Sequence, residues 1–384
     1  MYYSRAINLV ELLAKKSFFL FGPRATGKSS LIRNTFPKET LIINLLRSEL
    51  YLELSAKPHH LEHMIAAYSY PDVVVIDEIQ KIPMLLNEAH RLIEEKGIRF
   101  LLTGSSARTL RRKHQNLLAG RARQAELFPL TSFEITDFNL ERYLRYGGLP
   151  AIYLSDEPEE DLDAYIGTYL KEEIQIEASV RNIPGFSRFL QTAALTSGQM
   201  LNFTNIGSDV GLPPSTVREY YHILEDTFVG FLLPAYTKTI KRKAISTAKF
   251  YFFDTGVRNA LIGLKSIPKQ SEIYGQLFEH FIIIELRTYL SYRRLNKVLS
   301  YWRSKHGQEV DCIIGDEIAL EIKATDAIKD KHYKGLLVFA EEGLCQRYII
   351  VSHDPVRRKF KNIETIFWRD FLNELWHGEI LNVE

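Results

Sequence analysis

The sequence has few cysteines and no long apolar run. Cys312 and Cys345 are the only cysteines among 384 residues, and they lie far apart without metal-ligand spacing, so we expect neither a disulfide framework nor a zinc site. The best apolar stretch, residues 281–284, ends at Glu285 and is too short to cross a membrane. The amino terminus lacks a basic segment followed by an apolar core. We therefore expect a cytoplasmic protein without a signal peptide or a membrane partner.

An excess of charge of one sign is also missing. The formal net charge is +2, so any surface that binds nucleic acid must come from local clustering of basic residues. The hydrophobic share of 46% and the charged share of 25% are ordinary for a soluble globular protein. A chain of 384 residues is too long for one hydrophobic core and indicates about two to four domains.

A phosphate-binding motif lies near the amino terminus. Residues 18–21 form an apolar run typical of a buried parallel strand, and residues 30–33 begin a helical pattern. Between them, the spacing of glycine, lysine and serine matches the P-loop pattern G-x-x-x-x-G-K-[ST], whose backbone N–H groups surround phosphate oxygens. The residues expected to bind ATP are Gly22, Pro23, Arg24, Ala25, Thr26, Gly27, Lys28, Ser29 and Ser30.

Two residues of this loop have specific expected roles. Lys28 would place a positive charge on the β and γ phosphates of ATP, and the hydroxyl of Ser29 would ligate Mg²⁺. The alternative is a glycine-containing turn that happens to carry a lysine. The strand before the loop and the helix after it favour the P-loop.

Residues 72–80 match the Walker B pattern. Apolar β-branched residues in this stretch predict a strand buried on both faces, and its end carries two carboxylates. Asp77 is expected to hold Mg²⁺, and Glu78 is expected to orient and deprotonate the attacking water. An apolar strand that ends in Asp-Glu is common by itself, but its place after a complete P-loop favours the functional interpretation.

Two further groups are candidates for contact with the γ phosphate. The strand predicted at residues 98–105 ends in small polar residues, which makes Thr103 or Ser105 the candidate sensor, with an ordinary strand end as the alternative. Arg121, with Arg123 behind it, follows a basic helical stretch and is the candidate that neutralises charge in the transition state. Either arginine could instead be a solvated surface charge.

Taken together, these motifs resemble those of a prokaryotic AAA-family ATPase whose C-terminal half is a domain of unknown function. The resemblance covers essentially the whole chain. It implies a RecA-like core, a helical lid and ATP hydrolysis, but it adds little about the physiological role. The stretches that carry it are residues 22–29, 77–80, 102–105, 118–121 and 147–150.

The middle of the chain is predicted to be mostly helical. Residues 133–195 are expected to form a helical lid or linker. In residues 196–264, a short helix that ends at Gly211, a turn with two prolines and a second helix capped by Ser215 together form a helix-turn-helix pattern.

Two strand-like segments, residues 228–233 and 249–254, follow this pattern and flank a basic connection at residues 238–243. This arrangement predicts a winged helix. In one interpretation Arg218 and Tyr220 lie near a DNA groove and the lysines of the wing contact phosphates. In the other, the winged helix serves only as a packing or lid module.

The C-terminal third carries a second set of carboxylates. A helix at residues 273–286 contains Glu279, and a meander of three strands follows it. Because side chains alternate along a strand, Glu321 and Lys323 share one side, and Asp311 on the preceding strand can join them.

This arrangement resembles the PD-(D/E)xK nuclease site. The resemblance implies that Asp311, Glu321 and the helical Glu279 bind Mg²⁺, while Lys323 positions or helps deprotonate the attacking water. Val310 stands where many such nucleases have proline, and a Glu-x-Lys sequence on a strand can also be a surface ion pair. Basic residues nearby would suit a phosphate backbone or a solvated rim.

The sequence thus predicts an α/β protein with a RecA-like P-loop NTPase domain and a helical lid, a winged-helix middle domain and a C-terminal restriction-endonuclease-like α/β domain. We expect ATP, Mg²⁺ and DNA as cofactors and partners, with cleavage of DNA left open. The alternatives are an ATP-driven switch or scaffold and a chaperone-like ATPase. Whether Arg121 serves its own nucleotide or that of a neighbour in a homo-oligomer is also left open. The expected domains are residues 1–132, 133–195, 196–264 and 265–384.

Overall fold

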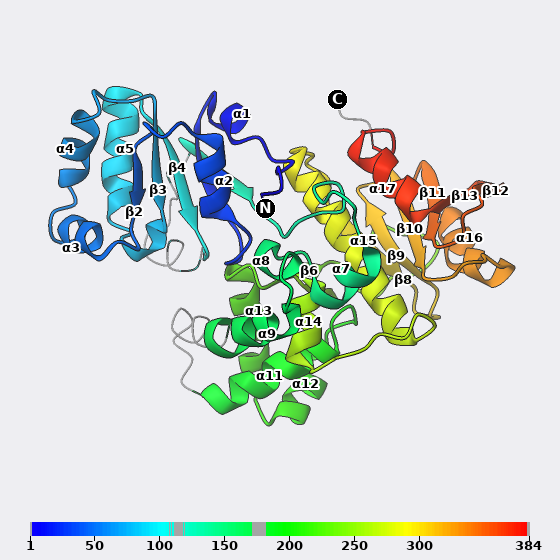
Figure 1. Cartoon of the computed structure of the whole chain (residues 1–384). Coiled ribbons are helices and arrows are strands. Elements are labelled where there is room, and N and C mark those ends of the chain that lie inside the picture. The colour runs from blue at the N-terminus through cyan, green and yellow to red at the C-terminus, as the bar shows by residue number, and fades with distance from the viewer. Residues whose placement is uncertain are drawn as a thin grey trace.

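Two sheets lie on opposite sides of the molecule, with a helical middle region beside them and one long helix between them (Figure 1). The computed structural model describes residues 2–106, 108, 110, 118, 120–170 and 182–381, without the side chains of 168–170. In these residues no helix is long and apolar enough to cross a membrane.

The amino-terminal sheet has five strands in the order β2-β3-β4-β1-β5, and all of its paired strands are parallel. Apolar residues cover both faces, as expected for a parallel sheet between helices. The strands are β1 (Ser17–Phe21), β2 (Ile42–Asn44), β3 (Val73–Asp77), β4 (Arg99–Gly104) and β5 (Ala122–Glu126). The helices are α1 (Leu9–Leu13), α2 (Lys28–Thr35), α3 (Ser48–Ala56), α4 (His60–Ala66), the 3₁₀ turn η1 (Ile79–Lys81) and α5 (Leu85–Lys96). This parallel sheet fits the P-loop NTPase fold predicted for this part.

The middle region is mainly helical and has its own apolar core. Its second helix-turn-helix element begins at Pro214, so Ser215 is not the N-cap that the sequence predicted; the fixed φ of proline suits the first helical position. The elements are α7 (Leu140–Tyr146), α8 (Pro150–Tyr153), α9 (Pro158–Ala164), the π-helix η2 (Tyr165–Leu170), α11 (Ile183–Leu195), α12 (Phe203–Val210), α13 (Pro214–Asp226), the antiparallel pair β6 (Gly230–Leu233) and β7 (Lys249–Phe252), and α14 (Thr255–Leu261).

The C-terminal sheet has six strands in the order β12-β13-β11-β10-β9-β8. Strands β8, β9 and β10 form the predicted antiparallel meander. Strands β12 and β13 were not predicted from the sequence. The elements are β8 (Leu299–Arg303), β9 (Glu309–Ile314), β10 (Ile318–Lys323), the 3₁₀ turn η3 (Asp330–Tyr333), α16 (Lys334–Ala340), β11 (Arg347–Ser352), β12 (Arg358–Phe360), β13 (Ile363–Phe367) and α17 (Trp368–Trp376).

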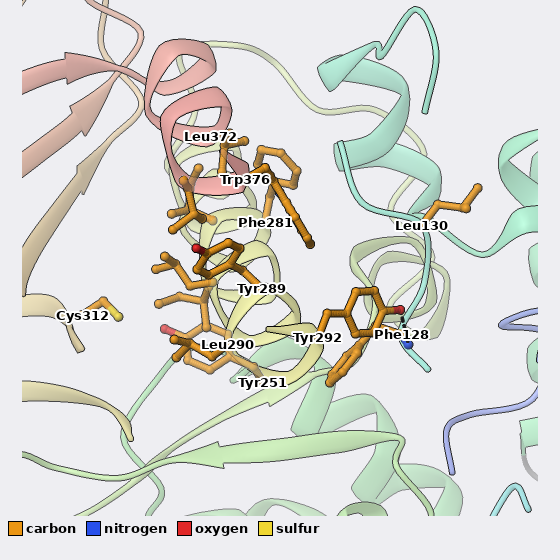
Figure 2. Close-up of a cluster of buried hydrophobic side chains, with 14 of the residues drawn as sticks. Phe128, Leu130, Tyr251, Phe281, Tyr289, Leu290, Tyr292, Cys312, Leu372 and Trp376 are labelled. Carbon is orange, nitrogen blue, oxygen red and sulfur yellow. Dashed lines mark hydrogen bonds between the residues drawn. The ribbon is translucent and has the colours of Figure 1, made fainter. Parts of the chain in front are cut away.

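Helix α15 (Glu272–Tyr292) joins the parts through one continuous hydrophobic core. The ring of Tyr289 meets Trp376 of α17 edge-on, with the ring centroids 5.4 Å apart. At the end of α15, the hydroxyl of Tyr292 accepts a hydrogen bond of 3.2 Å from the backbone N–H of Phe128 (Figure 2). A helix that is apolar on nearly all sides is typical of a buried element. Helix α15 is buried in this way, and both sheets pack against it.

Candidate nucleotide-binding site and C-terminal carboxylate cluster

The predicted P-loop connects the end of β1 to the start of α2. Gly22 has φ +148°, and a Cβ atom there would lie 2.3 Å from the carbonyl oxygen of Leu127, so only glycine fits. Gly27 has φ +91° and is the N-cap of α2. Ala25 also has a positive φ, of 58°. The backbone thus curls at the N-terminus of α2, where N–H groups and the helix dipole favour an anion.

Lys28 is buried inside this loop. Its ammonium donates hydrogen bonds to the carbonyl oxygens of Gly22, at 2.7 Å, and Pro23, at 2.9 Å. Burial lowers the pKa of Lys28 to about 8, against the opposing effect of Glu78 and Asp77. The lysine is therefore placed at the loop by backbone carbonyls, each of which a phosphate oxygen can replace.

Asp77 at the end of β3 links the loop to the neighbouring strand. One carboxylate oxygen accepts a hydrogen bond of 2.9 Å from the hydroxyl of Ser29, and the other accepts one from the hydroxyl of Thr103. Mg²⁺ in nucleotide sites is commonly held by one or two protein oxygens together with phosphates and water. Ser29 and Asp77 fit that arrangement, because both oxygens meet beside Lys28.

Glu78 follows Asp77 in a left-handed conformation, with φ 65°. Its backbone N–H donates to the hydroxyl of Thr103 at 3.2 Å, and its carboxylate is hydrogen-bonded to the side-chain amide of Gln80. The same amide donates to the hydroxyl of Ser105 at 3.1 Å. The hydroxyl of Thr103 is therefore occupied by the carboxylate of Asp77 and the backbone N–H of Glu78, whereas Ser105 belongs to a chain of polar groups that ends at the carboxylate of Glu78. The sequence assigned no role to Gln80, although it lies two residues after Glu78.

Arg121 immediately precedes β5, the strand that pairs with β1, but it lies at the opposite end of these strands from the P-loop. In the pairing of β1 with β5, Ala122 is opposite Ser17, the first residue of β1, whereas the loop begins after Phe21. The guanidinium of Arg121 is paired with Glu94 near the end of α5. The structure therefore does not bring Arg121 to the P-loop of its own chain.

The predicted C-terminal residues Asp311, Glu321 and Lys323 do come together. The ammonium of Lys323 lies 3.1 Å from a carboxylate oxygen of Asp311 and 2.7 Å from one of Glu321. Burial and the nearby Asp311 raise the pKa of Glu321 to about 8. The second oxygen of Glu321 is buried without a hydrogen-bond partner. An unsatisfied acceptor beside a second carboxylate is compatible with a bound cation.

Glu279 of α15 is directed to other partners. Its carboxylate accepts a hydrogen bond of 2.5 Å from the hydroxyl of Tyr251 and lies 3.4 Å from the ammonium of Lys249. Across the part of the chain that the structure describes, no three Asp, Glu, His or Cys side chains are arranged to hold a metal ion. The predicted three-carboxylate site of Glu279, Asp311 and Glu321 is thus not assembled. One lysine, Lys249, is paired with Glu279, and another, Lys323, is paired with Asp311 and Glu321. The sequence reasoning missed Lys249, which precedes Glu279 by 30 residues.

Comparison with known families now divides the chain in three. Residues 14–136 match the model of an AAA domain. This match supports an AAA-type ATPase. Two domains of unknown function follow, DUF8612 at residues 137–267 and DUF4143 at residues 274–369. The matches place the P-loop and Asp77 in the AAA domain and the C-terminal carboxylates in DUF4143.

Two relatives are described as uncharacterized proteins. A protein of Haemophilus influenzae is 26% identical over 231 residues, which are 55% of this chain and 56% of that protein. A protein of Methanocaldococcus jannaschii is 23% identical over 342 residues, which are 80% of this chain and 74% of that protein. The chain therefore spans little more than half of the Haemophilus protein.

Helix α13 packs against the AAA domain. Arg108, shortly after β4, pairs with Glu219 at 2.6 Å and with Asp226 at 3.3 Å. Tyr220, expected at a DNA groove, is only 6% exposed and packs against Phe186. That expectation was wrong for Tyr220, because helical periodicity turns its ring into the core of the middle region.

The connection between β6 and β7, residues 234–248, lies on the C-terminal sheet instead of projecting as a free wing. The backbone N–H of Tyr236 donates to the carbonyl of Tyr301 in β8, the edge strand, at 2.7 Å. Lys238 pairs with Asp316 at 2.7 Å, and Arg242 with Glu341 at 2.5 Å. An edge strand offers unpaired backbone groups that such a segment can satisfy. These two basic side chains therefore neutralise carboxylates of the C-terminal domain, and for Lys238 the structure differs from the interpretation in which the lysines of the wing contact phosphates.

A cavity of about 900 Å³ opens beside the carboxylate cluster, between the starts of α7 and α15 and the ends of β10 and β13. Lys323 is the residue of the cluster that reaches it. Its walls also carry Lys269, His332, His353 and Arg369. The acids Asp137, Glu141 and Asp326 line it as well, so the cavity is polar and carries charges of both signs where Lys323 becomes exposed.

Proposed function

We propose that the AAA domain binds ATP with Mg²⁺ and hydrolyses it. The observation that carries this proposal is the convergence of Lys28, Ser29 and Asp77 at the N-terminus of α2. Lys28 exchanges its two carbonyl partners for phosphate oxygens, and Ser29 and Asp77 hold Mg²⁺, which neutralises charge on the β and γ phosphates. Glu78 orients the attacking water and receives its proton, while Ser105 contacts the γ phosphate.

The titration of Lys28 predicts how ATP affinity depends on pH. Below pH 8 the ammonium is charged, and above pH 8 ATP must bind a protein that first takes up a proton. We expect affinity to fall by up to about ten-fold per pH unit above pH 8, until the pKa of the bound lysine is reached. Binding of a non-hydrolysable ATP analogue to the wild type, measured from pH 7 to 9.5, tests this, because Glu78, whose charge helps to set the pKa of Lys28, is kept. A profile identical to that of a Lys28→Met variant would contradict it.

We further propose that the C-terminal domain is a metal-dependent nuclease of the PD-(D/E)xK type that acts on DNA. The support is the meeting of Asp311, Glu321 and Lys323 on β9 and β10. Asp311 and Glu321 would hold a metal ion against the scissile phosphate, and Lys323 would position the water. The rival proposal is an ATP-driven switch or scaffold in which this domain binds nucleic acid or a protein partner without cleavage. We also propose an ATPase core at residues 1–132, a helical lid at 133–195, a winged helix at 196–264 and a nuclease-like domain at 265–384.

Cleavage assays with linear, nicked and single-stranded DNA separate the two proposals. With Mg²⁺ or Mn²⁺, with and without ATP, we expect cutting by the wild type and a loss of at least about 10²-fold in Asp311→Ala, because removal of a metal ligand removes the cation that stabilises the transition state. Asp316→Ala is the matched control, since Asp316 lies on the same hairpin and pairs with Lys238 instead. DNA binding without cutting would favour the switch, and no binding would remove DNA from the proposal.

We also propose that the protein forms a homo-oligomer in which Arg121 acts on ATP bound to a neighbouring copy. Because Arg121 lies far from its own P-loop, it can act on ATP only when a second copy presents it.

A further inference from the structure

Strand β7 presents two different faces to two different parts of the molecule. Phe250 points into the core of the middle region, where its ring meets Tyr221 with the centroids 4.8 Å apart. Lys249 and Tyr251, which alternate with it along the strand, point to the other side and reach Glu279 on α15. The middle region therefore contributes two polar side chains to the C-terminal carboxylate cluster.

Lys249 is a buried cation with carboxylates on two elements. The residue is 4% exposed, and its ammonium lies 2.7 Å from Glu309 of β9 and 3.4 Å from Glu279. Burial by itself would lower the pKa of Lys249, but Glu279, Glu309 and Asp311 outweigh that effect and raise it above its ordinary value. The ammonium also lies 5.0 Å from the centre of the Tyr301 ring. Lys249 is consequently a fixed positive charge.

The contacts of Lys249 explain why the three carboxylates do not form a metal-binding group. A divalent ion needs several oxygens that converge on one point. Glu279 is held by Lys249 and Tyr251, while Asp311 and Glu321 are held by Lys323. A fixed ammonium within hydrogen-bonding distance of the cluster also repels a second cation.

We propose that Lys249 is a resident cation that keeps Glu279 out of metal coordination, and that Glu279 joins Asp311 and Glu321 around a divalent ion only when the charge of Lys249 is absent. This inference rests on the proposed function, because it takes Asp311 and Glu321 to be metal ligands. Since Lys249 belongs to β7, movement of the middle region relative to α15 would carry its ammonium away from Glu279.

Mn²⁺ binding to the full-length protein without nucleotide tests the proposal, measured by electron paramagnetic resonance of free Mn²⁺. We expect Lys249→Met to bind Mn²⁺ about ten-fold more tightly than the wild type, because a repulsive charge is removed and a carboxylate is gained. Lys249→Arg keeps the charge and should match the wild type. Adding Asp311→Asn to Lys249→Met should abolish the gain, which assigns it to this cluster.

Three outcomes overturn the proposal. If the wild type binds Mn²⁺ and Lys249→Met binds it equally or more weakly, Lys249 does not compete with the metal, while the proposed metal site survives. If no variant binds Mn²⁺ at Asp311, the proposed metal-dependent function fails as well. Glu279→Gln, in the presence of Lys249, covers the case that Lys249→Met does not fold. It should bind Mn²⁺ like the wild type, and a loss of affinity would show that Glu279 is already a ligand.

Discussion

Replacing Glu78 by glutamine will leave ATP bound and reduce its turnover by about 10²–10⁴-fold, because the amide can no longer accept the proton of the attacking water. Glu78 is held in place by a left-handed backbone, by the bond from its N–H to Thr103 and by the amide of Gln80. Glutamine has nearly the same shape, so the loss of turnover should appear without a comparable loss of binding. Phosphate release and fluorescent ATP titration measure the two effects separately.

The matched control for this prediction is Glu88→Gln. Glu88 lies on α5 and pairs with Arg91 at 3.0 Å, away from the P-loop, so turnover should stay within about two-fold, because surface substitutions away from such a site usually have small effects. If Glu78→Gln hydrolyses ATP at the wild-type rate, Glu78 is not the general base.

Replacing Arg5 by alanine will destabilise the protein by about 3–5 kcal/mol, because it leaves Glu134 charged and buried without its partner. The guanidinium of Arg5 lies 3.1 Å from the carboxylate of Glu134, and both side chains are almost fully buried. It also donates hydrogen bonds to the carbonyl of Thr26 in the P-loop, at 2.8 Å, and to the hydroxyl of Tyr292 on α15, at 3.1 Å. Arg5 thus joins the nucleotide-binding loop to the central helix.

Thermal unfolding of Arg5→Ala measures this effect, with Arg33→Ala as the control. Arg33 is an exposed arginine of α2, and its removal should change the melting temperature little. Because Arg5 bonds the P-loop directly, ATP affinity should also fall in Arg5→Ala but not in Arg33→Ala. An unchanged melting temperature in Arg5→Ala would show that the buried pair with Glu134 contributes nothing to the stability of the fold.

The features that could be predicted from the sequence are those fixed by short-range geometry. The P-loop and Walker B residues follow a strand–loop–helix order, and the alternation of side chains along strands brought Asp311, Glu321 and Lys323 together correctly. Such rules need only a few neighbouring residues and a strand direction.

The features that could not be predicted depend on which distant segments pack together. The basic connection at residues 238–243 was expected to be part of a wing. Instead, the connection between β6 and β7 forms backbone hydrogen bonds with the edge strand β8, and Lys238 pairs with the carboxylate of Asp316. Glu279 was expected to face a metal, but β7 supplies Lys249 from another part of the chain. The strand register puts Arg121 at the end of the strands opposite to the P-loop. No local pattern shows these partners, because each comes from a different element.

ATP turnover by the wild type and by Lys28→Ala tests the central claim most directly. With ATP and Mg²⁺, we expect the wild type to release phosphate and Lys28→Ala to be slower by at least about 10²-fold, because the charge that stabilises the transition state at the phosphates is gone. The P-loop would then be the site of hydrolysis. Equal rates of phosphate release by the two proteins would contradict it.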